Sequence, residues 1–514
     1  MWVQCWVLTL VVLSLVPACG SLPLQDSRVP TYALTVPETQ SSALGQFIAP
    51  LTDGRAGHSG IVTLAEAKDA FAARLMLASA AELTLDIQYY IWRDDKTGLL
   101  LLQALHNAAQ RGVRVRFLLD DLNSAPIEDK LIALNQHPNI EVRLFNPFVI
   151  RGPRTFGFLT DFKRANRRMH NKSFTADNQA TIIGGRNVGD DYFSGADGVL
   201  FADLDALAIG DVVADVSADF DRYWNSQSSY PLETLTQEMS EDRRRRVISA
   251  IFKEHEAAEL FLQSIHDRES VRNMLADDGP LLWAVTRMVS DDPAKGLGLA
   301  EPEQLIIHGL QEIIGQPQRS LYLVSPYFVP TLAGVEALEA LALSGVKIHI
   351  LTNSYAASDV AIVHSGYAKW RQRLLRSGIR LYEMRPTVVA AEEPDTLKLP
   401  RFASAASSLH AKTFAVDGER VFIGSFNFDP RSAQLNTELG FIIESPELAK
   451  RTENIFAREV PFRAYELRLS PSERVYWLER DLGHTRRYDT EPESKLWQRM
   501  KVMVFSWLPI EWLL

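Results

Sequence analysis

The sequence predicts an α/β fold in which one unit occurs twice in tandem. A motif of His, Lys, Asp, Gly and Asn is found once in each half of the 514-residue chain, and every spacing inside the two copies agrees. Apolar segments on both sides of the motif also recur in the same order. Because His, Lys and Asp are each minor components of proteins, composition alone does not produce two such copies. The chain is therefore expected to be a duplication.

The first copy of the motif predicts a β-hairpin. Its residues are His170, Lys172, Asp177, Gly184, Gly185 and Asn187. Polar and apolar side chains roughly alternate over 171–177, which is typical of a half-buried strand. Residues i and i+2 of a strand share a face, so we expect His170 and Lys172 to project together. The turn-forming pair Asp177–Asn178 and an apolar run at 180–183 complete the hairpin.

The second copy predicts the same hairpin. Its residues are His410, Lys412, Asp417, Gly424, Ser425 and Asn427. The alternation over 411–417 is looser, but the turn pair Asp417–Gly418 and the apolar run 421–423 are retained. In both copies small residues close the second strand, where backbone or an anion can approach closely. A His, a Lys and an Asn amide in one place suit a phosphoryl group, and we expect phosphate contacts from Asn187, Asn427 and Ser425.

The repeat extends into the flanking segments. The corresponding pairs are 85–90 with 323–328, 111–119 with 344–352, and 203–210 with 438–445. The last pair places Asp203 and Glu438 at equivalent positions, where each carboxylate could orient a histidine ring. Asp205 competes with Asp203 for this role, and an ordinary carboxylate at a strand end is the alternative for both positions. Asp177 and Asp417 lie at the expected turns, which favours a structural role.

The doubled motif resembles the mark of the phospholipase D superfamily, and the resemblance covers roughly residues 65–470. It implies two tandem, pseudo-symmetric α-β-α sandwich domains with the active site at their interface. It also implies a catalytic set drawn from both motifs, with one histidine attacking phosphorus and the other protonating the leaving alkoxide. That set is His170, Lys172, Asp177, His410, Lys412 and Asp417. We assign the nucleophile to His170 on the resemblance alone, since pseudo-symmetry permits the reverse.

Physical chemistry agrees with such a pair of histidines. An imidazole is a nucleophile when neutral and an acid when charged, and both forms exist near physiological pH. The lysines would offset the negative charge that gathers on the phosphoryl oxygens. We therefore expect neither a metal nor an organic cofactor.

Further segments resemble the C type of bacterial cardiolipin synthase. They are 89–92, 167–172, 290–296, 424–432 and 511–514. The implied reaction moves a phosphatidyl group from one phospholipid to the headgroup alcohol of another. It would make cardiolipin from phosphatidylglycerol, with phosphatidylethanolamine or a second phosphatidylglycerol. The alternatives are a hydrolase of the same scaffold, acting on phospholipid or nucleic acid, and a catalytically silent envelope scaffold.

Composition narrows the class of partner. The net charge is −10, and no long basic tract interleaves with aromatic residues, so we expect no nucleic-acid surface. The run Arg243–Arg246 lies among acidic residues and predicts a solvated helix face. With 46% hydrophobic residues, the chain can bury sizeable cores. We also expect the protein to be a monomer and to work at a membrane surface.

The chain ends predict attachment to the bacterial cell envelope. Residues 1–19 resemble a lipoprotein signal in which Cys19 would be lipidated, and an uncleaved membrane anchor is the alternative. Only Cys5 accompanies Cys19, so the processed chain has no cysteine pair for a disulfide. The expected organisation is a linker at 20–64, domains at 65–290 and 291–470, and a tail at 471–514. The tail, rich in Trp, predicts either a membrane-interfacial segment or a helix packed on the second domain.

Overall fold

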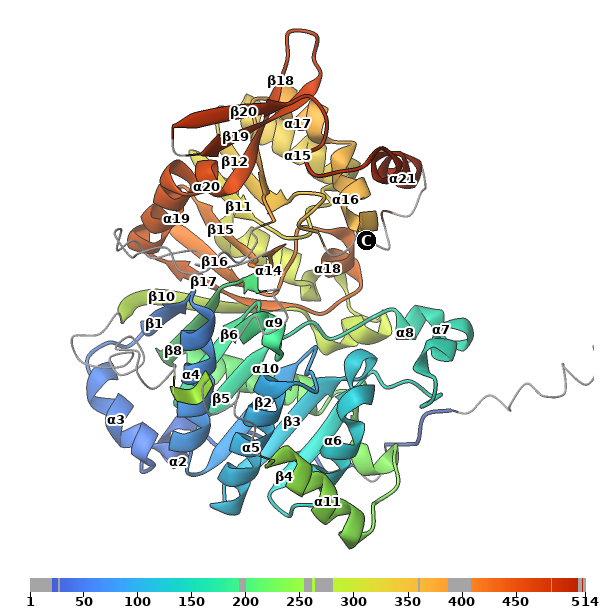
Figure 1. Ribbon diagram of the computed structural model, residues 1–514. Coiled ribbons are helices and arrows are strands. Elements are labelled where there is room, and N and C mark those ends of the chain that lie inside the picture. Colours follow the sequence, from blue (N-terminus) through green and yellow to red (C-terminus); the bar gives the residue numbers. More distant parts are fainter. Residues whose placement is uncertain are drawn as a thin grey trace, which may run out of the picture.

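The computed structural model consists of two halves, one above the other in Figure 1, each built on a β-sheet with helices on both faces. It describes residues 21–25, 28–193, 200–253, 261–263, 281–358, 361–386, 408–481, 483–506 and 511. The leader and Cys19 lie outside these residues. Within the described part of the chain, no helix is both long enough and apolar enough to cross a bilayer.

The first half contains an eight-stranded mixed sheet in the order β9-β4-β3-β2-β5-β6-β8-β1. Its strands are β1 (Ser59–Leu64), β2 (Thr84–Tyr89), β3 (Arg114–Asp120), β4 (Ile140–Phe145), β5 (Ser173–Ala176), β6 (Ala180–Gly184), β8 (Asp205–Gly210) and β9 (Ser229–Pro231). Its helices are α2 (Val36–Thr39), α3 (Ala43–Thr52), α4 (Ala67–Ala80), α5 (Lys96–Gln110), α6 (Glu128–Asn135), α7 (Gly157–Thr160), α8 (Phe162–Ala165), α9 (Asp190–Phe193), α10 (Val212–Trp224) and α11 (Glu241–Ile251). Alternate residues of β2 pack on α4 and α5 or face α10, which makes the sheet the middle layer of a sandwich.

The second half repeats this order as β18-β13-β12-β11-β15-β16-β17-β10. Its strands are β10 (Leu282–Ser290), β11 (Ser320–Val324), β12 (Lys347–Asn353), β13 (Arg380–Met384), β15 (Thr413–Val416), β16 (Arg420–Gly424), β17 (Leu439–Glu444) and β18 (Ala464–Leu469). Its helices are α14 (Ile306–Ile314), α15 (Thr331–Leu343), α16 (Ala361–Ala368), α17 (Arg371–Arg376), α18 (Pro430–Gln434), α19 (Pro446–Arg458) and α20 (Val460–Arg463). The duplication therefore extends to the topology of every strand in the two sheets.

The two sheets join edge to edge. Strands β1 and β10 pair antiparallel, with Ser59 opposite Ala284, so one sheet runs through both halves. A single hydrophobic cluster also spans the junction and includes Val216 of α10 and Phe456 of α19. The prediction of two tandem, pseudo-symmetric α-β-α sandwiches is confirmed.

Both predicted hairpins are present. Residues 177–179 join β5 to β6, with φ angles of +50° at Asp177 and +48° at Asn178, and residues 417–419 join β15 to β16, with +56° at Asp417 and +68° at Gly418. Asp, Asn and Gly tolerate this left-handed conformation, and two such residues in succession match the twist of a hairpin. Each His-x-Lys segment enters its hairpin immediately before the first strand.

The linker expected at 20–64 requires correction. Helices α2 and α3 lie within it, and its last six residues form β1, which lies between β8 and β10 in the continuous sheet. The segment before α2 also packs on the first half, since the guanidinium of Arg116 donates to the carbonyl of Thr31 at 2.9 Å. The surrounding Ser, Thr and Gly residues resemble a linker in composition, although β1 itself is a short buried run.

The C-terminal tail adds a hairpin and a helix. Strands β19 (Val475–Asp481) and β20 (His484–Tyr488) continue the sheet beyond β18. Helix α21 (Leu496–Ser506) then packs on α16, at the upper right of Figure 1. The tail is thus packed on the second half, although most apolar side chains of α21 remain exposed.

Candidate active site

Both histidines line one pocket of about 380 Å³ between the two halves. The first half contributes Tyr90, Ile91, Arg93, His170, Asn187, Tyr192 and Phe201. The second half contributes Tyr327, Ile362, Val363, His410, Asn427, Asp429, Arg431, Ser432 and Asn436. His170 and His410 are each only 7% exposed, so their rings border the pocket from a largely desolvated position. The pocket is polar where the histidines lie and apolar toward α16.

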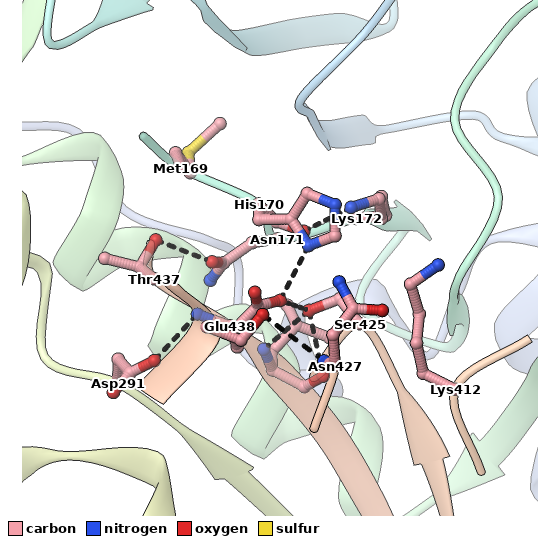
Figure 2. A network of polar contacts seen from close by, with 12 residues as sticks. Met169, His170, Asn171, Lys172, Asp291, Lys412, Ser425, Asn427, Thr437 and Glu438 are labelled. Atoms are coloured by element: carbon pink, nitrogen blue, oxygen red, sulfur yellow. Dashed lines mark hydrogen bonds and ion pairs between the residues drawn. The ribbon is translucent and has the colours of Figure 1, made fainter. Parts of the chain in front are cut away.

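Each histidine is hydrogen-bonded to a carboxylate from the opposite half. Nδ1 of His170 lies 2.8 Å from Oε2 of Glu438, as Figure 2 shows, and Nδ1 of His410 lies 2.6 Å from Oδ2 of Asp203. A carboxylate on Nδ1 fixes that nitrogen as a donor and leaves Nε2 to face a substrate. The two pairs are crossed, so neither half holds a complete His–carboxylate pair alone.

Backbone pairing between the halves produces this crossing. The amide of His170 donates to the carbonyl of Thr437 at 2.9 Å, directly before Glu438. In the same way the amide of His410 donates to the carbonyl of Ala202 at 2.7 Å, directly before Asp203. A two-stranded parallel sheet of β7 (Phe201–Ala202) and β14 (Ser408–Leu409) supports the second contact. Each histidine segment is therefore aligned with the carboxylate segment of the other half.

Asp205, the competing candidate, does not contact a histidine. Its carboxylate is buried between the guanidinium groups of Arg74 and Arg186, at 2.9 Å and 3.3 Å. Asp203 instead lies against Gly185, where an added Cβ would be 2.1 Å from Oδ1 of Asp203. The small residue at this position therefore admits the carboxylate that holds His410.

The His410–Asp203 pair keeps its carboxylate ionised, while the pKa of His410 lies below its usual value because burial and Lys412 outweigh Asp203. Burial alone would raise the pKa of Asp203, but the charge and the hydrogen bond of His410 outweigh burial and bring that pKa well below its usual range. Burial and the charge of Lys412 lower the pKa of His410, whereas Asp203 acts in the opposite direction. The ionised carboxylate therefore helps His410 to carry a proton.

The His170–Glu438 pair differs in its electrostatics. Burial, followed by the charges of Lys172 and Lys412, lowers the pKa of His170 well below its usual value. Burial also raises the pKa of Glu438 to about 7, against the opposing charge of Lys172 and the hydrogen bond from Ser425. His170 is thus held neutral, with a partner that titrates near physiological pH.

The two lysines lie beside the histidines. Nζ of Lys172 donates to the carbonyl of His170 and lies 5.6 Å from the centre of the Tyr90 ring. Nζ of Lys412 donates to the carbonyl of His410 and lies 3.2 Å from Nε2 of that ring. Burial lowers the pKa of Lys172 well below its usual value. An anionic phosphoryl group bound there would favour the charged form of the two lysines, which can then offset its negative charge.

Two of the three predicted phosphate-binding residues line the pocket, and the third does not. Asn187 and Asn427 line the pocket, and the amide of Asn187 donates to the hydroxyl of Tyr192 at 3.0 Å. Ser425 is not among the lining residues, because its hydroxyl donates to Oε2 of Glu438. The small residue after each second strand thus lies against the carboxylate of its own half, Gly185 by close approach and Ser425 by a hydrogen bond.

Asp177 and Asp417 lie at the turn ends of the hairpins, away from the histidines. The carboxylate of Asp177 accepts from the backbone amides of residues 82, 83 and 84, at 2.8–3.1 Å. Asp417 accepts from the amides of 318, 319 and 320. In both halves this carboxylate ties the turn to the segment that leads into the neighbouring antiparallel strand, β2 or β11.

Sequence reasoning missed the support around Glu438. The backbone amide of Glu438 donates to Oδ2 of Asp291 at 2.8 Å, as Figure 2 shows. Nζ of Lys295 donates to the same oxygen at 2.9 Å. Both belong to the segment 290–296, which the sequence marked only by its resemblance to the family. The aromatic walls of the pocket, Tyr192 and Phe201, also carried no sequence signal, because they lie in very short elements.

The arginine run outside the site forms surface ion pairs. Arg243 of α11 contacts Asp129 at 2.8 Å, and Arg244 and Arg245 pair with acidic residues of their own helix. These groups are largely exposed, as a solvated helix face predicts.

Comparison with known proteins gives concordant results. The chain matches the family model described as "Cardiolipin synthase, PLD-like domain" at residues 75–224 and again at 310–460, once in each half. It is 47% identical to "Cardiolipin synthase C" of Escherichia coli K12, over 92% of this chain and 99% of that protein. A "Cardiolipin synthase" of Staphylococcus aureus Mu50 is 24% identical, over 76% of this chain and 65% of that protein.

The fold is also found in a solved structure. The phosphatidylserine synthase of Haemophilus influenzae Rd KW20 superposes with a TM-score of 0.55, covering 92% of this chain and all of that one. The sequence identity between the two is 13%, so this likeness concerns the fold alone.

Proposed function

Because the chain belongs to the family of phospholipase D-like cardiolipin synthase domains, we propose that it transfers a phosphatidyl group between phospholipids. The reaction makes cardiolipin from phosphatidylglycerol, with phosphatidylethanolamine or a second phosphatidylglycerol as the other lipid. The observation that carries this proposal is the pair of crossed His–carboxylate contacts facing one pocket. Two imidazoles in that arrangement supply both the nucleophile and the acid of a two-step displacement.

In the first step, Nε2 of His170 attacks the phosphorus of the donor lipid. The bond between phosphorus and the headgroup oxygen breaks, and His410 gives its proton to the departing alkoxide. In the second step, the hydroxyl of the acceptor lipid loses its proton to His410 while its oxygen attacks phosphorus. The N–P bond then breaks, which releases the product and restores both histidines.

The electrostatics support this assignment of roles. The positive charges around His170 favour its neutral form, which a nucleophile requires. Burial and Lys412 also lower the pKa of His410, but the ionised Asp203 opposes them and stabilises a proton on that ring, which an acid requires. Lys172 and Lys412 offset charge on the phosphoryl oxygens, and the amides of Asn187 and Asn427 orient the phosphoryl group.

Incubating the purified protein with phosphatidylglycerol vesicles, with and without phosphatidylethanolamine, tests this function. We expect cardiolipin among the products by mass spectrometry, and we expect it to be absent with the His170→Ala variant. If phosphatidylethanolamine is the donor, cardiolipin formation depends on it and ethanolamine is released. Phosphatidic acid as the only product would instead identify a hydrolase.

We further propose that the protein works attached to the membrane through α21. The exposed apolar side chains of this helix are Leu496, Trp497, Met500, Met503 and Val504. The helix packs on α16, which contributes Ile362 and Val363 to the pocket, so an apolar face lies one helix away from the site. Helices α7 and α8 of the first half lie on the same side of Figure 1 as α21, and the exposed apolar residues in and before them are Phe156, Leu159 and Phe162. Trp and Met on an exposed helix suit the interface of a bilayer.

Replacing Trp497, Met500 and Met503 together by Glu is expected to weaken binding to phosphatidylglycerol vesicles by tenfold or more. Burial of large apolar side chains stabilises membrane association by roughly 1–3 kcal/mol each, and acidic side chains are repelled by the anionic surface. Vesicle flotation measures the bound fraction. The same replacement at Leu343, an exposed apolar residue at the end of α15, is the control and should leave binding unchanged. Equal losses at both places would refute a specific role for α21.

The lipoprotein leader, with lipidation of Cys19, lies outside the described residues and stays a prediction. Metabolic labelling with a radioactive fatty acid tests it, since the label should be absent from a Cys19→Ser variant.

A further inference from the structure

The second half contains an apolar cavity of about 490 Å³ that the mechanism does not use. It lies between α14 and α15, above strands β11 and β15, and is lined mainly by Leu310, Ile314, Leu321, Leu323, Gly334 and Phe414. This volume is in the range of small-molecule sites, about 300–1,000 Å³. Leu321 and Leu323 occupy one face of β11, so the cavity follows the direction of an extended strand.

The equivalent space in the first half is filled. There α4 packs on both α5 and α9, and Phe71 of α4 contacts Phe193 of α9 with ring centres 5.2 Å apart. The corresponding helices α14, α15 and α18 are not packed against one another in this way, and α14 has 9 residues where α4 has 14. The two halves share a topology, so the open cavity is a specific feature of the second.

The cavity ends beside the candidate active site. Asp429 borders both the cavity and the catalytic pocket. Along the segment before it the side chains alternate, since Phe426 and Phe428 line the cavity whereas Asn427 lines the catalytic pocket. Burial raises the pKa of Asp429 to about 7, so this boundary carries little charge in mildly acidic solution. One layer of backbone therefore separates an apolar cavity from the place where a phosphoryl group would bind.

We propose that this cavity binds one acyl chain of the phospholipid whose phosphate lies between His170 and His410. The inference rests on the proposed function, because a phospholipid substrate presents a phosphate and long apolar chains in one molecule. The cavity is lined mainly by apolar side chains and shares Asp429 with the catalytic pocket, which suits a hydrocarbon chain beside the phosphoryl site. Affinity should therefore grow with acyl-chain length.

Filling the cavity tests this inference. A Cβ added at Gly334 would lie 3.5 Å from Cβ of Pro330 and 3.7 Å from a ring carbon of Phe428, so a Gly334→Leu side chain enters without a backbone clash. Leu also favours the helix more than Gly does. Ala337→Leu, at an exposed position of the same helix, is the matched control. Ala333→Phe is a second cavity-filling variant should Gly334→Leu not fold.

We expect Gly334→Leu to raise the KM for long-chain phosphatidylglycerol by about tenfold or more, while kcat/KM for dihexanoyl phosphatidylglycerol stays within about twofold of the unsubstituted protein. Ala337→Leu should change neither value. A Gly334→Leu protein that discriminates chain length as the unsubstituted protein does would overturn the proposal.

A binding measurement separates the cavity from the reaction. Phosphatidylglycerol with a diazirine in the middle of one acyl chain should photocrosslink to peptides of α14, β11 and α15, and Gly334→Leu should abolish these crosslinks. Crosslinking there without any lipid turnover would keep the acyl site and refute the proposed function. Turnover with crosslinks confined to other elements would keep the function and refute the acyl site.

Discussion

The His410→Ala variant is expected to form a stable phosphatidyl–His170 adduct from a lipid whose headgroup is p-nitrophenol. This leaving group departs without a proton, so loss of the acid should hardly affect the first step. With phosphatidylglycerol as donor, whose alkoxide must be protonated, the same variant should lose activity by roughly 10²–10⁴-fold. Release of p-nitrophenolate and the intact mass of the protein measure both effects.

His170→Ala is the matched variant, and it should form no adduct with either lipid. The double variant should be hardly less active than His170→Ala, because a nucleophile and an acid that act as one unit do not contribute additively. The reverse pattern, with the adduct on His410 in the His170→Ala protein, would exchange the two roles. Pseudo-symmetry alone permits that outcome, and the different charges around the two rings argue against it.

The hairpins and their histidines were predictable because the information is local. Alternation, turn residues and the repeat together indicate two equivalent hairpins, and both are present. Position favoured a structural role for Asp177 and Asp417, although the family resemblance placed both in the catalytic set, and each carboxylate accepts backbone amides at its turn. Periodicity and turn chemistry depend on neighbours within a few residues, which a sequence displays directly.

The crossed pairing of histidines and carboxylates was not predictable from the same information. The repeat aligned Asp203 with Glu438 but did not show which histidine each would contact. That choice depends on pairing between segments more than 200 residues apart, such as β7 with β14. The choice between Asp203 and Asp205 was open for a related reason, since residues i and i+2 share a face and only tertiary packing separates them.

Strand β1 was missed because composition was given more weight than local pattern. Its sequence, Ser-Gly-Ile-Val-Thr-Leu, is short and follows a stretch rich in Gly, Ser and Thr. Only its position between β8 and β10 identifies it as a central strand, and that pairing is entirely long-range. Its counterpart β10 forms the other side of the same junction, so the two halves are fused by the strands that open their repeats.

Within the candidate site, the two halves differ in the protonation of their carboxylates. Asp203 lies against Gly185 and is stabilised as an anion by His410, whereas Glu438 accepts a proton near pH 7 despite the hydrogen bond from Ser425. A symmetric pair would give two rings of equal basicity. Two different partners separate the acid–base properties of the rings, as a nucleophile and an acid require.

Glu438→Gln is therefore expected to lower activity and to raise stability at alkaline pH. Glutamine can still accept a hydrogen bond from His170 but cannot stabilise positive charge on that ring, so turnover should fall by about 10²–10⁴-fold. The folded-state pKa of Glu438, about 7, lies above its usual value of 4.5. The stability from this group is then fully present below about pH 4.5 and is lost as pH rises through about 7. The free energy of unfolding of the variant, measured relative to that of the unsubstituted protein, should therefore rise by roughly 2–3 kcal/mol between pH 5 and pH 8.

For the Asp203→Asn variant we expect a loss of stability that does not depend on pH between 5 and 8. The folded-state pKa of Asp203 lies below its usual value, so its stabilising contribution is present at neutral pH and is lost only in strong acid. The Asp203→Asn substitution should therefore lower the free energy of unfolding by a similar amount at pH 5 and pH 8. Urea unfolding of both variants at the two pH values measures the difference. The same pH dependence in both variants would mean that the two carboxylates are equivalent, and the electrostatic basis for assigning His170 as nucleophile would fall with it.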